Sequence, residues 1–249
     1  PLLTLLGQGT PDRPYEVNND GPTLALANNS VLYADAKWTL PRFDIRLLLG
    51  NQDIETDGLV DFDATELPLV SFQQSGGFAE IQTAELQFLS NADSWGSDWL
   101  TYIGGLYYIQ SDAGYDPVDL YVGFSDVSAL PGGTLAAPLL DPLLGQLRRI
   151  VPTPVDPVTV RIRGILNTES SAAFMQTTAA FTDWLSLTVG GRYQTETRKL
   201  TTATVGFPGT AQPLLRYAPR SADTSNFSPK VSLDLRPMDD VLTYLSYTK

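Results

Sequence analysis

Hydrophobic and polar residues alternate along several stretches of the chain, and the three-to-four-residue spacing of an amphipathic helix is weak nearly everywhere. In residues 184–198, Leu185, Leu187, Val189 and Tyr193 would share one face, opposite a face of Ser, Thr, Gly, Arg and Gln. Successive side chains of a strand point to opposite faces of its sheet. The spacing therefore predicts β-strands with one apolar and one polar face.

Eight segments of this kind are predicted, and they group into four hairpins. The predicted hairpins pair residues 31–39 with 42–52, 79–90 with 98–110, 169–181 with 184–198, and 225–235 with 241–249. Within each hairpin the connection is short and turn-like.

The connections between the hairpins are long and rich in acidic residues, proline or glycine. They are predicted at residues 53–78, 111–168 and 199–224. Long structureless connections are uncommon in compact soluble domains. A transmembrane β-barrel has this asymmetry, because its turns are short on one side of the membrane and its loops are long on the other.

The direction of the apolar face separates two β architectures. A barrel turns it outward to lipid and lines a wet lumen with polar side chains, whereas a soluble β-sandwich turns it inward. The strands reach the ~9–11 residues that a bilayer crossing needs, and their polar faces are rich in Thr, Gln, Ser and Gly. Aromatic residues gather near the predicted strand ends, at Trp38, Phe43, Trp95, Trp99, Trp184, Tyr244 and Tyr247. The pattern favours an all-β fold: an antiparallel transmembrane β-barrel segment of about eight meandering strands.

Composition removes several classes of function. The 249 residues include no cysteine and no histidine, and the formal net charge is −12. A Ser-His-Asp mechanism would lack its base, and a zinc site would have to be built from carboxylates alone. Nucleic-acid phosphate would repel an acidic chain. We expect no enzyme, no resident metal or other cofactor, and no nucleic-acid partner.

Three stretches resemble the barrel of TonB-dependent outer-membrane receptors, especially those for iron complexes. Residues 172–198 place Phe174 and Gln176 before Phe181 and a short turn, and LSLTVGGRYQTETR follows, like one hairpin of that family. NFSPKVSLDLRPMDDVLTYLSYTK at 226–249 is similar to the family's serine-proline-lysine strand, its turn and a tyrosine-rich strand. TAELQFLSN and the aromatic strand after it are similar to a third pair, and RFDIRLLLG resembles an earlier strand.

The resemblance implies a receptor of the bacterial outer membrane that takes up a nutrient complex, most often a ferric siderophore. Its partners would be the ligand, TonB, outer-membrane lipid and lipopolysaccharide. The family barrel has about 22 strands around a plug, and TonB is contacted through the plug region. No plug domain or signal peptide is visible in the sequence. We therefore expect residues 1–249 to be part of the barrel domain, as an incomplete barrel.

Two other interpretations are consistent with the alternation. One is a soluble or surface-exposed β-sandwich that binds carbohydrate or protein. The other is a small, complete eight-stranded outer-membrane barrel with a structural or adhesive role, in which the first strand would pair with the last.

The longest predicted connection holds three aromatic candidates for ligand binding. Tyr115, Tyr121 and Phe124 fall there, and aromatic side chains on outward loops can stack on flat ligands. The alternative is a small hydrophobic cluster that stiffens the loop. No residue is predicted to be catalytic.

A second candidate is basic. Arg161 and Arg163, with Arg148 and Arg149, form a patch in an otherwise acidic chain. They could contact an anion, either a ferric-siderophore ligand or lipopolysaccharide phosphate, or they could be solvated residues of a loop and strand end.

The third charged feature is an acidic run, Asp53, Glu55, Asp57, Asp61, Asp63 and Glu66. Hard cations such as Ca²⁺ take carboxylate ligands, but the residue order of a calcium-binding loop is not met. The sequence favours a solvated acidic loop.

Overall fold

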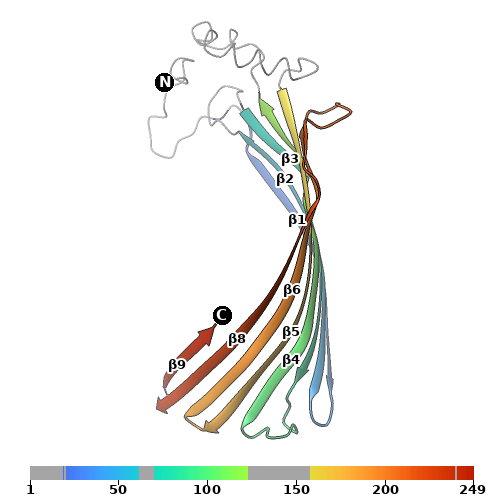
Figure 1. Ribbon diagram of the computed structural model, residues 1–249. Helices are drawn as coiled ribbons and strands as arrows, with labels where there is room; N and C mark the ends of the chain where they lie inside the picture. The colour runs from blue at the N-terminus through green and yellow to red at the C-terminus, as the bar shows by residue number, and fades with distance from the viewer. Residues whose placement is uncertain (1–18, 20, 62–69, 123–157, 239) are drawn as a thin grey trace, which may run out of the picture.

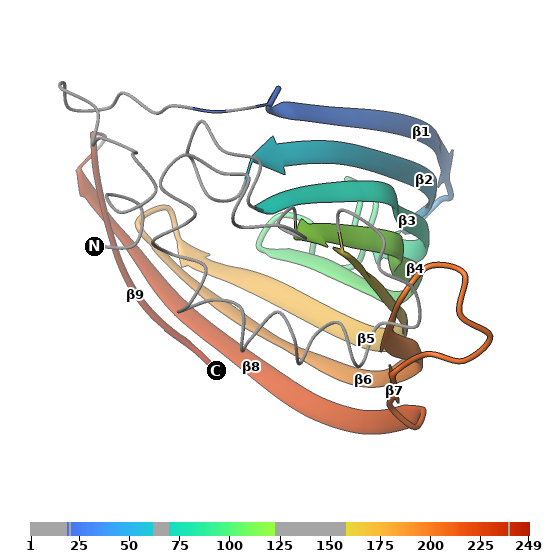
Figure 2. The same cartoon turned by 90° about the horizontal axis from the view of Figure 1, so that it is seen from above.

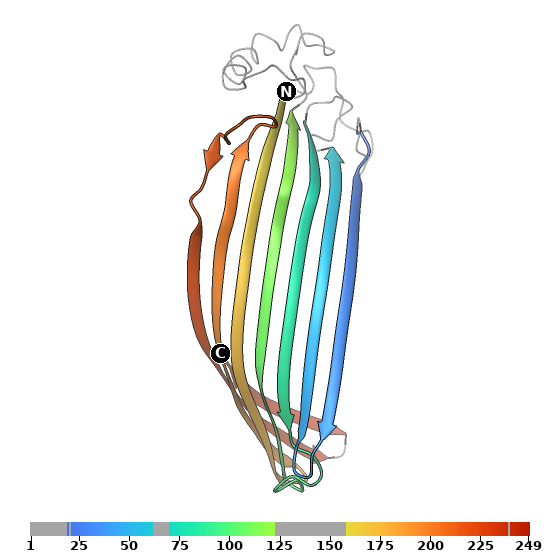
Figure 3. The same cartoon turned by 90° about the vertical axis from the view of Figure 1, so that its right-hand side faces the viewer.

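The computed structural model describes residues 19, 21–61, 70–122, 158–238 and 240–249, which form a single antiparallel sheet. Its strands are β1 (Leu24–Thr39), β2 (Asp44–Asp61), β3 (Val70–Leu89), β4 (Leu100–Val122), β5 (Val158–Thr182), β6 (Leu185–Gly206), β7 (Leu215–Arg216), β8 (Arg220–Met238) and β9 (Val241–Thr248). The strands lie side by side in the order β1-β2-β3-β4-β5-β6-β8-β9, and the two-residue β7 pairs with β6 (Figures 1 and 3).

The sheet is curved and unclosed. Figure 2, the view from above, shows an arc in which β1 and β9 form the two free edges. Within the described residues, β1 pairs with β2 and β9 with β8, and no ladder joins the two edges. The architecture is that of an incomplete barrel, as predicted, and the interpretation as a small closed barrel is wrong.

The strand ends that flank residues 40–43, 90–99, 183–184 and 239–240 lie at one end of the sheet, which is the lower end in Figure 1. The strand ends that flank residues 62–69, 123–157 and 207–219 lie at the other end, which we call the upper end. The predicted alternation between the two ends is thus present, but the strict alternation of short and long is wrong, because the interval 62–69 is shorter than the connection 90–99.

Several strands are much longer than predicted. β4 has 23 residues and β5 has 25, against the ~9–11 of one bilayer crossing. The prediction of a loop over 111–168 is therefore wrong at both ends, since β4 continues to Val122 and β5 starts at Val158.

The strand register separates two faces of the sheet. Directly opposed residues of an antiparallel pair share a face. One such row runs across the sheet through Ala36, Leu47, Leu86, Leu106, Ala173, Tyr193 and Phe227. We call the face that carries this row the outer face and the opposite one the inner face.

Burial shows which of the two faces is concave. On the outer face Leu106 is 57% exposed and Met175 is 62% exposed, whereas on the inner face Ser170 is 2% and Ala172 is 6% exposed. Side chains converge on the concave side of a curved sheet, so the inner face is the concave one. The large apolar side chains thus point outward from a single layer, and the interpretation as a sandwich with a dry centre is wrong.

Outward-facing apolar residues form a continuous apolar belt in the lower half of the sheet. On β6 the belt runs from Leu185 to Tyr193. At ~3.3 Å per residue and a tilt of ~35–45°, this span is about 20–25 Å high, close to the apolar band of a membrane barrel. Separately, among the described residues no helix is long and apolar enough to cross a membrane.

Aromatic side chains border the belt. At its lower edge Trp38, Trp99, Phe181 and Trp184 are exposed, as predicted for the three tryptophans. At its upper edge Tyr108, Tyr193 and Phe227 lie on the outer face. The predicted girdle residue Tyr244 is an exception, because it pairs with Asp234 on the inner face of β9.

Behind the belt, the inner face is polar and cross-linked. Lys37 Nζ lies 2.7 Å from Asp44, and Arg46 lies 2.6 Å from Asp35. The guanidinium of Arg192 lies over the ring of Tyr107, 5.2 Å from its centroid. A polar inner face behind an apolar outer face is the arrangement of a barrel with a hydrated lumen.

Candidate functional site

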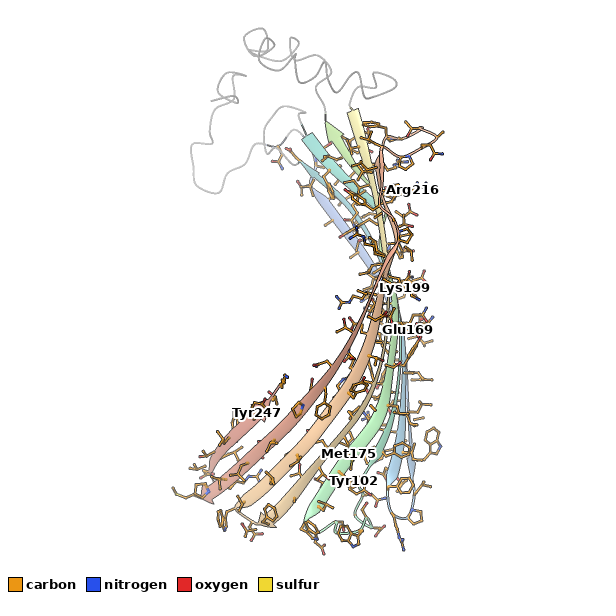
Figure 4. All side chains as sticks on the ribbon, in the orientation of Figure 1. Tyr102, Glu169, Met175, Lys199, Arg216 and Tyr247 are labelled. Atoms are coloured by element: carbon orange, nitrogen blue, oxygen red, sulfur yellow. The ribbon has the colours of Figure 1, made fainter. Side chains whose placement is uncertain are left out.

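Above the belt, the outer face changes from apolar to charged. The outward residues of β2–β6 there include Asp53, Glu55, Asp57, Asp61, Glu80, Asp112, Asp119, Arg161, Arg163 and Lys199. Figure 4 shows the change along one face: Tyr102 and Met175 lie in the belt, and Glu169, Lys199 and Arg216 lie above it. Charged side chains in these positions suit water and not lipid.

The inner face changes in the opposite sense. Three complete rows across β2–β6 are Ile54, Ala79, Ala113, Leu166, Leu200; Thr56, Gly77, Tyr115, Gly164, Ala203; and Gly58, Gln74, Val118, Ile162, Val205; the row above them, Val60, Phe72, Leu120, Val160, has no member from β6. We call these residues the upper inner wall. None of them is charged, so the polarity of the sheet reverses on both faces above the belt, and on the inner face the change comes beyond the row of Thr168 and Arg198.

A hollow of about 510 Å³ is set into the upper inner wall. Its lining includes the small residues Ala79, Ala113 and Gly164 and the larger residues Tyr115 and Leu200. A Cβ added at Gly164 would meet no other atom within 4 Å. The side chain of Tyr115 is 49% exposed. Small-molecule sites are concave and mostly apolar, with few polar groups, and this hollow fits that description.

Irregularities in the strands lie beside the hollow. The registers of β2 with β3 and of β4 with β5 shift between Thr56 and Gly58 and between Tyr115 and Val118. Gly76 has a φ of +81°, and a Cβ there would lie 2.5 Å from a backbone oxygen of β4. Because of the β4 bulge, Tyr115 and Val118 both face inward. Bulges commonly re-aim side chains next to binding sites.

The three predicted aromatic residues are not brought together. Tyr115 is part of the upper inner wall, in β4 and not in a loop. Tyr121, also in β4, points to the outer face, where its hydroxyl lies 2.9 Å from Gln73 Oε1. Phe124 lies outside the described residues. The loop assignment is thus wrong for both tyrosines, and a role of either in binding stays a prediction.

The two predicted arginines lie on β5, on the outer face, and each has an acidic partner. Arg161 donates to both carboxylate oxygens of Asp119 over 2.8 and 2.6 Å, and these hydrogen bonds raise the pKa of Arg161. Arg163 Nε lies 2.9 Å from Asp116. The arginines point away from the upper inner wall. Their predicted partners Arg148 and Arg149 lie outside the described residues.

The acidic run is mostly strand and not loop. Asp53, Glu55, Asp57 and Asp61 occupy alternate positions of β2, and so they all face outward. No cluster of three possible metal-ligating residues occurs in the part of the chain that the structure describes. Asp63 and Glu66, the last members of the run, lie outside it.

The sequence interpretation missed most of the upper inner wall. Val160 and Ile162 alternate with Arg161 and Arg163, and this period-two pattern was available in the sequence. The loop over 111–168 is predicted because this interval is long and rich in proline. The alternation instead continues into the upper part of the sheet, where the apolar residues face inward.

An unclosed, curved antiparallel sheet with an outward apolar belt defines a segment of a membrane-type β-barrel. The chain belongs to the family described as TonB dependent receptor-like, beta-barrel, whose family model matches residues 4–249. This confirms the resemblance found in the strand motifs. The family is a class of receptors.

Comparison with individual proteins adds a fold-level match. No curated protein sequence matches the chain. Among solved structures, the ferric yersiniabactin uptake receptor FyuA from Yersinia pestis is similar, with a TM-score of 0.60 and 12% sequence identity. The match covers 90% of this chain and 28% of the FyuA chain. At this identity the likeness shows the fold alone, and this chain spans little more than a quarter of that receptor.

Proposed function

We propose that this chain is part of a bacterial outer-membrane receptor that takes up a nutrient complex with energy supplied through TonB, and that the complex is a ferric siderophore. Membership of the receptor family supports the class of function. The fold-level likeness to a ferric yersiniabactin uptake receptor is compatible with the class of ligand.

The observation that carries the proposal is the reversal of polarity above the belt. A purely structural wall would need an apolar surface only where it meets lipid. Here the part of the sheet beyond the inner-face pair Glu196 and Arg198 is charged outside and uncharged inside, with a hollow of about 510 Å³. Such a surface is suited to hold the uncharged, aromatic or aliphatic part of a metal chelate in an opening that leads inward.

In this proposal the upper inner wall supplies apolar contacts, and Tyr115 supplies an aromatic ring and a hydroxyl to the lining of the hollow. The remaining contacts come from other parts of the receptor. Residues 1–249 then act as one sector of the barrel domain, and TonB engages a plug region that is separate from this sector.

The free edges of the sheet support the sector assignment. Backbone groups left unpaired in lipid cost several kcal/mol each, and among the described residues no strand pairs with the outer edge of β1 or of β9 at the height of the belt. Further strands would satisfy those groups, and a receptor barrel of about 22 strands supplies them.

A transport assay tests the function. The gene is deleted, and uptake of ⁵⁵Fe-loaded siderophores is measured in iron-limited cells with and without TonB. Uptake of at least one siderophore should fall to the background of TonB-deficient cells and return with the restored gene. Unchanged uptake of every siderophore, with cobalamin or haem lost instead, would contradict the ligand class. Unchanged uptake of all these ligands would contradict the function.

A further inference from the structure

Three side chains from three neighbouring strands form a row on the outer face near the upper end. Arg163 of β5 is paired with Thr204 of β6, and Thr204 is paired with Arg216 of β7. Directly opposed residues share a face, so a hydroxyl lies between two guanidinium-bearing side chains. Arg216 reaches this position only because the chain after β6 folds back and adds β7 to the edge of β6.

The row lines a polar hollow of about 260 Å³. Arg161 and its β6 partner Gly206 line the same hollow, and so do Gly209 and Thr210 of the segment after β6. Within that segment, Thr210 Oγ1 donates to the carbonyl of Phe207 over 2.8 Å. Since one water occupies ~30 Å³ in the liquid, the hollow has room for a phosphate together with part of the sugar that carries it.

The donor groups of the three arginines are only partly used. Each guanidinium has five N–H groups. Among the described residues, Arg161 directs two nitrogens to Asp119 and Arg163 directs one to Asp116, while Arg216 has no ion-pair partner. Three cations and two carboxylates leave this cluster with a net positive charge. The remaining N–H donors of Arg163 and Arg216 are therefore open to an anion.

We propose that this hollow binds a phosphate group of lipopolysaccharide. A guanidinium pairs with phosphate through two parallel N–H···O bonds, and the Thr204 hydroxyl adds a donor between the two arginines. The hollow opens on the outer face, away from the upper inner wall, so it faces the surrounding outer leaflet and not a ligand inside the barrel. It is a second site, independent of the transported complex.

The height of the hollow above the belt determines which part of the lipopolysaccharide molecule can reach it. On β5, Arg163 lies about eight residues beyond the upper edge of the belt at Ser171, which corresponds to roughly 20 Å above it at ~3.3 Å per residue and the usual tilt. Acyl chains do not extend to this height. The phosphates bound here are those of the saccharide portion.

Binding to the intact receptor, purified from outer membranes in detergent, tests the proposal. The probes are phosphorylated lipopolysaccharide, the same lipopolysaccharide after enzymatic dephosphorylation, and inorganic phosphate. The double variant R163Q/R216Q should bind phosphorylated lipopolysaccharide about tenfold or more weakly, because it loses two charge-assisted contacts. The matched control is R198Q, which removes an arginine of the inner face of β6 that is paired with Glu196.

The other probes and variants separate the outcomes. Dephosphorylated lipopolysaccharide should bind the unaltered receptor as weakly as phosphorylated lipopolysaccharide binds the double variant. Inorganic phosphate should compete only at high concentration. If the double glutamine variant fails to insert into the membrane, R163K/R216K is tested in its place. This variant keeps both charges, and so it should retain part of the affinity. Equal affinities of the receptor and R163Q/R216Q, or of the two lipopolysaccharides, would overturn the proposal.

The proposal depends on the outer-membrane location and not on the transported ligand. A receptor that fractionates with the outer membrane but binds both lipopolysaccharides equally would contradict the phosphate site alone. A protein that fractionates elsewhere would contradict the location, and with it the proposed function.

Discussion

Two adjacent leucines of β2 allow a direct test of which face meets lipid. Leu47 is on the outer face, opposite Ala36 and Leu86. Leu48 is on the inner face, opposite Asp35 and Glu85. The same substitution, leucine to arginine, can therefore be placed on either side of one strand.

The expected cost of Leu47→Arg follows from its depth in the belt. Arginine on the lipid face of a barrel costs ~2–4 kcal/mol at the bilayer midplane and ~0–1 kcal/mol near the interfaces. The row of Leu47 includes the border residues Tyr193 and Phe227, but on β2 itself Leu47 lies between the outward apolar residues Ile45 and Leu49, and so we expect an intermediate cost of about 1–3 kcal/mol. This lowers the folding equilibrium constant by roughly 5- to 150-fold.

Leu48→Arg is the matched control. The new guanidinium would lie in the polar inner layer between two carboxylates, one of which already binds Arg46. We expect a change within about 1 kcal/mol, because the charge stays in the hydrated inner layer, where ion pairs between solvent-exposed groups contribute ~0–1 kcal/mol.

The assay is urea unfolding of the intact receptor in lipid vesicles, followed by the heat-dependent gel mobility of the folded barrel. The midpoint should fall for Leu47→Arg and stay near that of the unaltered receptor for Leu48→Arg. The opposite order, or equal losses for both variants, would refute the assignment of the faces.

Two glycine substitutions give further predictions. Gly164→Phe should fill the hollow of the upper inner wall and weaken ligand binding about tenfold or more, since an apolar contact surface of that size is worth ~1.5–3 kcal/mol. Binding is measured by a filter-binding assay, and Thr202→Phe on the outer face is the control. Gly76→Ala should destabilise the receptor by about 1–3 kcal/mol because of its positive φ, whereas Gly21→Ala, which meets no atom within 4 Å, should not. A wild-type affinity in the first case, or a wild-type urea midpoint in the second, would contradict these assignments.

The hairpins, and the alternation of the connections between the two ends of the sheet, could be predicted, because both depend on local signals. Turn residues mark the four short connections, and Leu185, Leu187 and Val189 mark the lipid face of β6. The upper strand ends could not be predicted from the alternation of apolar and polar residues. That prediction assumes one apolar face along the whole strand, whereas Val160 and Ile162 face inward above the belt.

The faces of individual residues beyond a bulge also could not be predicted. Tyr115 and Tyr121 are separated by an even number of positions, which places them on the same face of a regular strand. The bulge between Tyr115 and Val118 shifts the register, and the two tyrosines face opposite ways. Such a shift depends on the neighbouring strands, and β3 has its own bulge beside Gly76.

The ion pairs of Arg161 and Arg163 are likewise a product of register. Asp119 becomes the partner of Arg161 only when β4 and β5 pair beyond the bulge. The sequence shows basic residues in an acidic chain, but not the strand that lies beside them.

The reversal of polarity is tested most directly by single-cysteine labelling along β5. The chain has no native cysteine, so each introduced thiol can carry one nitroxide label. In the intact receptor in lipid vesicles, labels at positions 173, 175 and 177 should be accessible to oxygen dissolved in the bilayer. Labels at 161, 163 and 165 should be accessible to a water-soluble nickel complex. Oxygen accessibility at positions 172, 174 and 176, or continuing to position 161, would contradict the account.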